Sequence, residues 1–154
     1  MKVNLGSLEL TSPSFADGDR LPEKHTSNGS GVSPALVWSA APENTQSFAL
    51  ICHDPDAPLI RGFVHWVAWN ISKEWTGIPE GATDGFLEGM NGYGRTGWAP
   101  AAPPAGHGTH RYYFHLYALD CTMPDTSLSA EQLLDRIDAH VIEQSRLVGT
   151  YSNT

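Results

Sequence analysis

Residues 99–120, APAAPPAGHGTHRYYFHLYALD, change character halfway along and decide the fold class. The first half is proline, glycine and alanine, a composition that does not form regular structure. The second half is a dense aromatic and aliphatic run that is typical of a strand. Alternation with a period of two places His110 on one face with Tyr112 and Phe114, and Arg111 on the other face. The stretch therefore predicts a rigid loop that leads into a buried strand, with His110 and Arg111 at the junction.

Four other segments have the pattern of strands. Residues 3–10 alternate between polar and apolar side chains, and residues 35–39 (ALVWS) and 47–56 (SFALICHDPD) are short apolar runs separated by a turn. Residues 62–72, GFVHWVAWNIS, are apolar on both faces, as in a central strand that is buried on two sides. Together these segments predict a mainly antiparallel β domain.

One segment, residues 129–146, has the pattern of a helix. Ser129 is a favourable N-cap, and Gln132 stands three residues later, as in a capping box. The residues that would form one apolar stripe at helical spacing are Leu133, Leu134, Ile137, Val141 and Ile142. We expect a helix over 129–146 that packs on the sheet, followed by a short extended piece, LVGTY, at 147–151.

The composition is that of an ordinary globular protein. The 154 residues suffice for one domain, 1–154, with 40% hydrophobic and 17% charged residues and a net charge of −8. The basic residues are scattered, which excludes a nucleic-acid-binding surface. No apolar run reaches the roughly 18 residues that span a membrane, and the N-terminus lacks the apolar core of a secretory signal, so we expect a cytoplasmic protein. Cys52 and Cys121 are expected to be buried free thiols.

Two carboxylates follow the apolar strand in HDPDAP, residues 53–58. Asp54 and Asp56 are two residues apart on an extended chain and would point the same way. Such a pair can orient a histidine or bind a cation, and it can also simply cap its own turn. The bond between Ala57 and Pro58 is a candidate for the cis form.

Histidines stand in both of the strongest strands. His65 shares a face with Phe63 inside an apolar strand, where it is either a core residue or a polar group in an apolar pocket. His110 and Tyr112 offer two hydrogen-bonding groups at a strand mouth. The glycines of the preceding PPAGHG would leave backbone N–H groups accessible, and these groups together with an imidazolium would suit an oxyanion. The alternative is that His110 caps its strand and Arg111 pairs with a neighbour.

Several kinds of chemistry lack their usual patterns. The chain has seven histidines, but no HExxH, no CxxC and no HxxxH on a helix that would select a metal site. It also has no GxSxG nucleophile elbow and no GxGxxG dinucleotide loop. We therefore expect no metal, no cofactor and no catalytic nucleophile.

Taken together, the motifs resemble the phosphatidylethanolamine-binding protein family, in particular its bacterial and archaeal branch, the Raf kinase inhibitor-like proteins. The matching pieces are SPALVW, DPDAP, HWVAWNI, GRTGW, PPAGHGTHRYYFHLYALD and HVIEQSRLVGTY, in the family's order. The resemblance implies a Greek-key-like antiparallel β-sandwich with one C-terminal helix. It also implies a small pocket for anionic groups, whose ligand-binding residues would be Asp54, Asp56, His65, His110 and Tyr112. The rim would contain Pro58, as the family's cis proline, together with Phe63, Pro103, Pro104 and Gly106.

One departure from the family pattern lies in the rim. The family usually has G-Y-x-G where this chain has GWAP, with Trp98 for tyrosine and Pro100 for glycine, so the shape of the rim can differ. Since the net charge is negative, capture of an anion has to be local, within a Debye length of about 8 Å. The carboxylates would hydrogen-bond the imidazoles and favour their charged form.

The function implied by the resemblance is the binding of a small phosphate or carboxylate group, with a regulatory role and a possible homodimer. Two alternatives remain open at this point. The pocket could perform general acid–base chemistry, as in a lyase, isomerase or cyclase. The chain could instead inhibit a protease or kinase through its long surface loop, residues 74–102.

Overall fold

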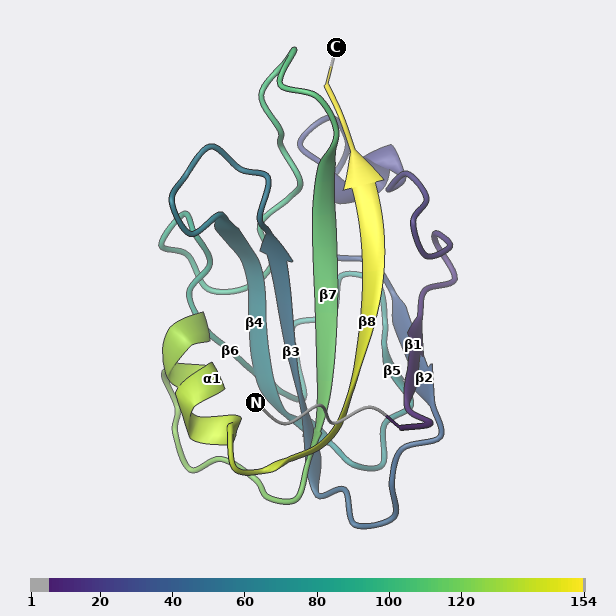
Figure 1. The fold of residues 1–154 in the computed structure, drawn as a ribbon, viewed down its shortest axis with the longest axis vertical. Coiled ribbons are helices and arrows are strands. Elements are labelled where there is room, and N and C mark those ends of the chain that lie inside the picture. Colours follow the sequence, from purple (N-terminus) through teal and green to yellow (C-terminus); the bar gives the residue numbers. More distant parts are fainter. Residues whose placement is uncertain (1–5, 154) are drawn as a thin grey trace.

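The computed structural model describes residues 6–153, which form two antiparallel sheets and one α-helix (Figure 1). The elements are β1 (Glu9–Thr11), η1 (Glu23–His25), β2 (Leu36–Ser39), β3 (Ser47–Asp54), β4 (Phe63–Ser72), β5 (Gly77–Ile78), β6 (Leu87–Glu88), β7 (His110–Leu119), α1 (Ala130–Ile137) and β8 (Val141–Tyr151). The predicted antiparallel β-sandwich with a late helix is confirmed.

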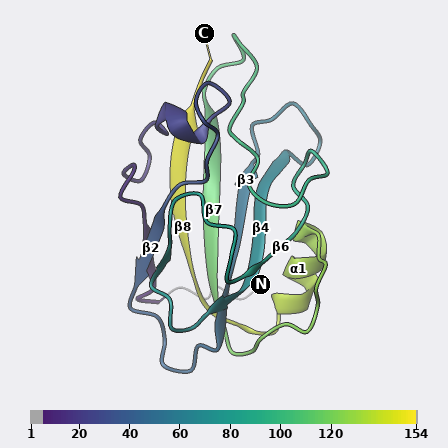
Figure 2. The same ribbon diagram turned by 180° about the vertical axis from the view of Figure 1, so that it is seen from behind.

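The larger sheet has the strand order β6-β4-β3-β7-β8, and the smaller has the order β1-β2-β5. Figure 2 shows the smaller sheet and its loops on one face of the larger sheet, whereas α1 lies beside β4 and β6. The main core fills the space between the sheets. Its largest fully buried members include Trp66, Phe48, Phe114 and Tyr151. A second core lies under α1, where Leu133 and Ile137 pack on the other face of β3 and β4.

The central strands form where the sequence predicts them because their side chains are buried. In β3, seven of eight residues are buried, all except His53, and the middle of β4 is equally apolar. In β7, burial alternates residue by residue, with His110, Tyr112 and Phe114 inside and Arg111 exposed. This alternation is the one predicted from the sequence, and it directs His110 into the protein.

The predicted helix is correct at its start and wrong at its end. The side chain of Ser129 accepts a hydrogen bond from the backbone of Gln132, and the reciprocal bond completes the capping box. The helix nevertheless ends at Ile137, and Val141 begins an eleven-residue strand that pairs with β7 along its whole length. Val141 and Ile142 fit a helical stripe by spacing, but as β-branched residues they also favour a strand, and the long ladder to β7 decides between the two.

Three smaller predictions can also be compared with the structure. Of the strand predicted over residues 3–10, only Glu9 and Leu10 lie in β1, Glu9–Thr11; residues 6–8 are not in a strand, so the prediction is wrong there, and residues 3–5 lie outside the described part. No peptide bond in residues 6–153 is cis, so the expected cis bond before Pro58 is wrong. Cys52 is a buried free thiol as predicted, whereas Cys121 is partly exposed. Within the described residues, no helix is long and apolar enough to cross a membrane.

Candidate anion-binding site

Three strands bring the predicted site residues to one end of the larger sheet, the upper end in Figure 1. Asp54 is the last residue of β3, and its partner in the ladder is Phe63, the first residue of β4. Since β3 is antiparallel to both of its neighbours, the end of β3 meets the starts of β4 and β7, which carry His65 and His110. Residues far apart in the sequence therefore converge through strand pairing alone.

A pocket of about 210 Å³ opens at this end of the sheet. It is lined by Asp54, Ala57, Pro58, Leu59, Phe63, His65, Tyr93, Ala102, Pro103, Pro104, His110 and Tyr112. Pockets for drug-sized ligands typically measure about 300–1,000 Å³, so this one has room only for a small chemical group. All of the predicted site residues line the pocket except Asp56 and Gly106. That the lining residues bind a ligand stays a prediction.

A chain of three side chains runs through the pocket mouth. Nδ1 of His110 donates to Oδ2 of Asp54 at 2.7 Å, and both residues are almost completely buried. The other ring nitrogen of His110, Nε2, lies 2.6 Å from Nδ1 of the exposed His107. Asp54 is held in turn, because its Oδ1 accepts the backbone N–H of Asp56 at 2.8 Å. The carboxylate therefore fixes the orientation and the tautomer of His110 and leaves Nε2 as its functional atom.

Tyr112 lines the pocket, and its phenolic hydroxyl has no partner within residues 6–153. The oxygen is buried and, among the described residues, forms no hydrogen bond. Burial raises the pKa of Tyr112 well above its usual value, and the nearby Asp54 adds to this effect, so the group stays a neutral O–H donor. A buried hydroxyl without a partner costs free energy, and such groups call for an explanation. A ligand that accepts this hydrogen bond would supply one.

His65 lies among apolar and aromatic side chains. Its Nδ1 donates to the carbonyl oxygen of Ala99 at 2.7 Å, and Phe63 and Tyr112 pack against its ring. Burial lowers the pKa of His65 to about 4, although the bond to Ala99 and the charge of Asp54 oppose the shift. The expectation that the carboxylates keep this imidazole charged is therefore wrong. At neutral pH, Nε2 of His65 is an acceptor and not a donor.

Asp56 is turned away from the pocket and toward the other face of β7. Its carboxylate accepts from the backbone N–H of Arg111 at 2.9 Å and from the guanidinium at 2.8 and 3.0 Å. These hydrogen bonds from Arg111 lower the pKa of Asp56. The two carboxylates of DPDAP thus have different partners. Of the alternatives for Arg111, the structure shows the one in which it pairs with a neighbouring carboxylate. Its bond to the backbone ties the loop after β3 to the start of β7.

The glycine-rich rim offers fewer backbone donors than the sequence suggested. The N–H of Gly106 donates to Asn153, and the N–H of His107 donates to Pro104. Gly106 and Gly108 have φ values of 76° and 90°, and nothing lies within 4 Å of where a Cβ would stand on either. The turn that carries His107 therefore projects into open space.

Sequence reasoning missed several residues of the site. Ala57 and Leu59 flank the predicted Pro58, and Ala102 precedes the predicted prolines of the rim, so all three were close to motifs already singled out. Tyr93 contacts the ring of Phe63 from a glycine-rich loop, with ring centroids 4.7 Å apart. An aromatic residue flanked by glycines is the one signal that could have drawn attention to it.

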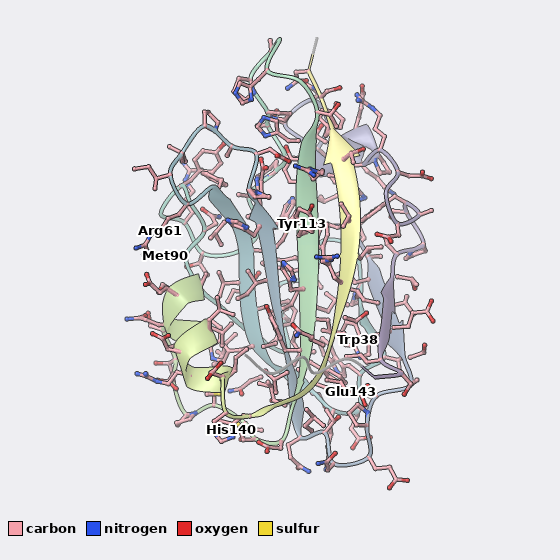
Figure 3. The ribbon with its side chains drawn as sticks, in the orientation of Figure 1. Trp38, Arg61, Met90, Tyr113, His140 and Glu143 are labelled. Carbon is pink, nitrogen blue, oxygen red and sulfur yellow. The ribbon has the colours of Figure 1, made fainter. Side chains whose placement is uncertain are left out.

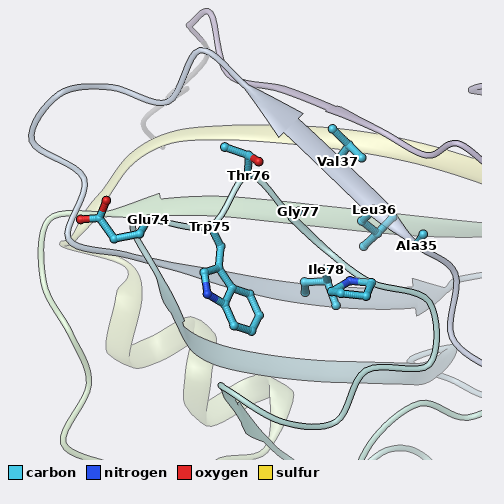
Figure 4. A pocket seen from close by; sticks show the side chains of 9 residues that line it. Ala35, Leu36, Val37, Glu74, Trp75, Thr76, Gly77 and Ile78 are labelled. Atoms are coloured by element: carbon cyan, nitrogen blue, oxygen red, sulfur yellow. The ribbon is translucent and has the colours of Figure 1, made fainter.

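A larger hollow of about 540 Å³ lies elsewhere, beside the smaller sheet (Figure 4). It is lined by residues 35–37 and 74–79, of which Glu74 is the only charged one. Trp75 and Ile78 form much of its wall, and no histidine takes part. Because it offers shape without a converging set of polar groups, the smaller pocket at the strand ends is the better candidate site.

Comparison with known proteins identifies the family of the chain. The sequence profile described as phosphatidylethanolamine-binding protein matches residues 11–152. The chain belongs to the phosphatidylethanolamine-binding protein family. The match spans all ten elements except the first two residues of β1, so the pocket residues lie within it.

Relatives of the phosphatidylethanolamine-binding protein family cover nearly the whole chain. A UPF0098 protein of Chlamydia trachomatis is 38% identical over 149 residues, which cover 94% of this chain and 98% of that protein. A crystal structure of a putative phosphatidylethanolamine-binding protein homolog from the same organism has a TM-score of 0.91 at 36% identity, covering 98% of this chain and 99% of the other. Escherichia coli YbcL, described as a member of the mammalian family, has a TM-score of 0.90 at 30% identity, covering 97% and 100%.

Proposed function

We propose that the pocket binds a small anionic group, a phosphate or a carboxylate, and that the protein acts as a regulatory binding protein. One observation carries the proposal. The pocket is lined by both His110, which Asp54 orients, and Tyr112, whose buried hydroxyl has no hydrogen-bond partner among the described residues. Two donors on one apolar pocket suit the oxygens of an anion, because charge-assisted hydrogen bonds are strong where water is excluded.

In this proposal, His110 supplies the positive charge of the pocket. Arg111 is engaged by Asp56 on the outer face, and His65 is neutral above about pH 4. His110 forms its ion pair with the buried Asp54. Protonation of His110 therefore turns Nε2 into a donor without leaving an isolated charge in the protein.

His65 favours a ligand that carries a hydrogen-bond donor besides its anionic oxygens. Its Nε2 is an unprotonated acceptor and, among the described residues, has no protein partner. A phosphate monoanion has such a donor in its P–OH group, and a phosphate ester that carries an amine has one in its ammonium group. The family's name refers to a phospholipid whose head group has this chemistry, and the pocket volume of about 210 Å³ suits the head group alone.

Isothermal titration with inorganic phosphate at pH 6 tests the proposal. The expected result is saturable binding at one site per chain. The binding should be weakened by His110→Ala and unchanged by Arg95→Ala, a control at a basic residue that the structure does not place at the pocket. Absence of binding of phosphate, sulfate and acetate at every pH between 5 and 8 would overturn it.

A further inference from the structure

Three different metal-binding side chains converge at the opposite end of the larger sheet, where β7 ends and β8 begins. The carboxylate of Asp120, the thiol of Cys121 and the imidazole of His140 each place a ligand atom within 4.8 Å of the other two. Figure 3 labels His140 at the lower end of the molecule, and the anion pocket lies at the upper end. This second cluster is therefore separate from the pocket.

Backbone hydrogen bonds hold all three residues in place. The N–H of Asp120 donates to the carbonyl of His140 at 3.0 Å, one step beyond the last ladder pair of β7 and β8. The carbonyl of Cys121 accepts from the hydroxyl of Ser47 at 2.6 Å. The N–H of His140 donates to the carbonyl of Ile137, the last residue of α1. The side chains thus project from fixed positions, which lowers the entropy cost of gathering them around an ion.

The side chains are also close to the separations that an ion needs. With metal–ligand bonds of about 2.0–2.3 Å, the ligand atoms of a tetrahedral zinc site lie about 3.3–3.6 Å apart. Nδ1 of His140 and Oδ1 of Asp120 are now 2.8 Å apart in a hydrogen bond, and the whole set lies within 4.8 Å. Side-chain rotations that shift the ligand atoms by about an ångström would therefore bring them to these separations, without movement of the backbone.

The chemistry of the cluster selects the class of ion. Among the described residues, the carboxylate of Asp120 has a hydrogen bond from His140 and no ion pair with a lysine or an arginine. Both side chains are accessible, with 48% of Asp120 and 43% of His140 exposed. Thiolate and imidazole ligands suit borderline transition-metal ions, whereas calcium and magnesium require all-oxygen sets.

We propose that Asp120, Cys121 and His140 form a binding site for a transition-metal ion, zinc above all, with water as the fourth ligand. On binding, the thiol releases its proton and the hydrogen on Nδ1 of His140 moves to Nε2, so that sulfur and Nδ1 both reach the ion. The ion would join the end of β7 to the junction between α1 and β8. Motif spacing does not reveal the site because its ligands meet across a strand pair.

Cobalt(II), a spectroscopic substitute for zinc, tests the site in the full chain, prepared without an affinity tag and kept reduced. The expected result is one cobalt per chain, with a thiolate-to-cobalt charge-transfer band, displacement by zinc, and a rise in melting temperature on addition of zinc. Cys121→Ser should abolish the band, and Cys121→Ser and His140→Gln should each weaken zinc binding by at least about tenfold.

Two matched controls keep the test specific. Cys52→Ala removes the other thiol, which is fully buried in the core, and His107→Gln removes an exposed histidine at the pocket. Both variants should keep the cobalt spectrum of the parent protein. A parent protein without the charge-transfer band at millimolar cobalt would overturn the proposal. So would zinc binding that Cys121→Ser leaves unchanged.

Discussion

Nδ1 of His110 lies 2.7 Å from Oδ2 of Asp54, and both side chains are buried at the point where β3 ends and β7 begins. This pair links the fold to the proposed function. The antiparallel pairing of the two strands brings the residues together, and the carboxylate directs the other ring nitrogen of the imidazole, Nε2, to the pocket mouth.

Asp54→Asn should weaken phosphate binding at pH 7 by about tenfold or more, because a neutral amide no longer favours the charged imidazole. Binding should recover in part at lower pH. Asp56→Asn is the matched control, since it changes a neighbouring carboxylate that pairs with the half-exposed Arg111. Loss of this exposed pair should lower the stability only slightly and leave the affinity nearly unchanged. Equal effects of the two substitutions on affinity, measured by titration calorimetry, would contradict the assigned roles.

His107→Ala should strengthen phosphate binding by about fivefold, the value of one ordinary hydrogen bond. In the structure, His107 occupies Nε2 of His110 at 2.6 Å, so a ligand that uses this atom has to displace it. The turn between Gly106 and Gly108 has free space into which it can move. Weaker binding in the variant would show that His107 contacts the ligand and does not compete with it.

Tyr112→Phe should reduce affinity by about fivefold without reducing stability. The hydroxyl has no hydrogen-bond partner among residues 6–153, so its removal deletes no protein contact and relieves an unsatisfied buried group. Titration calorimetry and chemical denaturation of the same variant separate the two effects. If stability falls by as much as binding does, the hydroxyl has a structural role instead.

His65 should make the fold sensitive to acid. Its pKa is lowered to about 4 in the folded state, so below pH 6.5 the unfolded chain binds a proton that the native protein does not. Stability should therefore fall as the pH drops from about 6.5 toward 4, by about 2 kcal/mol at pH 4.5 from this residue.

His65→Asn, which keeps a donor for the carbonyl of Ala99, should remove that part of the loss in denaturation curves at pH 7 and 4.5. His115 will retain a further part, because burial also lowers its pKa to about 4. An unchanged acid sensitivity in His65→Asn would mean that His65 is charged in the native protein.

Much of the fold could be predicted because β3, β4 and β7 contain strong apolar patterns that leave few alternatives. The capping box at Ser129 likewise located the start of α1. The end of α1 could not be predicted, because the apolar residues after Ile137 satisfy both a helical stripe and a strand. Only the pairing of β8 with β7, a long-range interaction, separates these possibilities.

The site was predictable to the extent that its residues end or begin strands. Asp54, His65, His110 and Tyr112 lie within motifs that also have a clear place in the sheet. His107 was missed because its contact with His110 depends on the conformation of a glycine turn. The same limit applies to Asp56, whose choice of Arg111 over the pocket is a matter of side-chain direction.

The most direct test of the central claim is the affinity for sulfate as a function of pH between 5 and 8.5, because sulfate keeps its charge across this range. We predict strong binding at the acidic end and a progressive loss as His110 becomes neutral, since only its charged form donates from Nε2 while Nδ1 remains bonded to Asp54. His110→Gln, which places an uncharged donor near Nε2, should bind more weakly and without pH dependence. An affinity that stays flat across the range in the parent protein, or that His110→Ala leaves intact, would contradict the account.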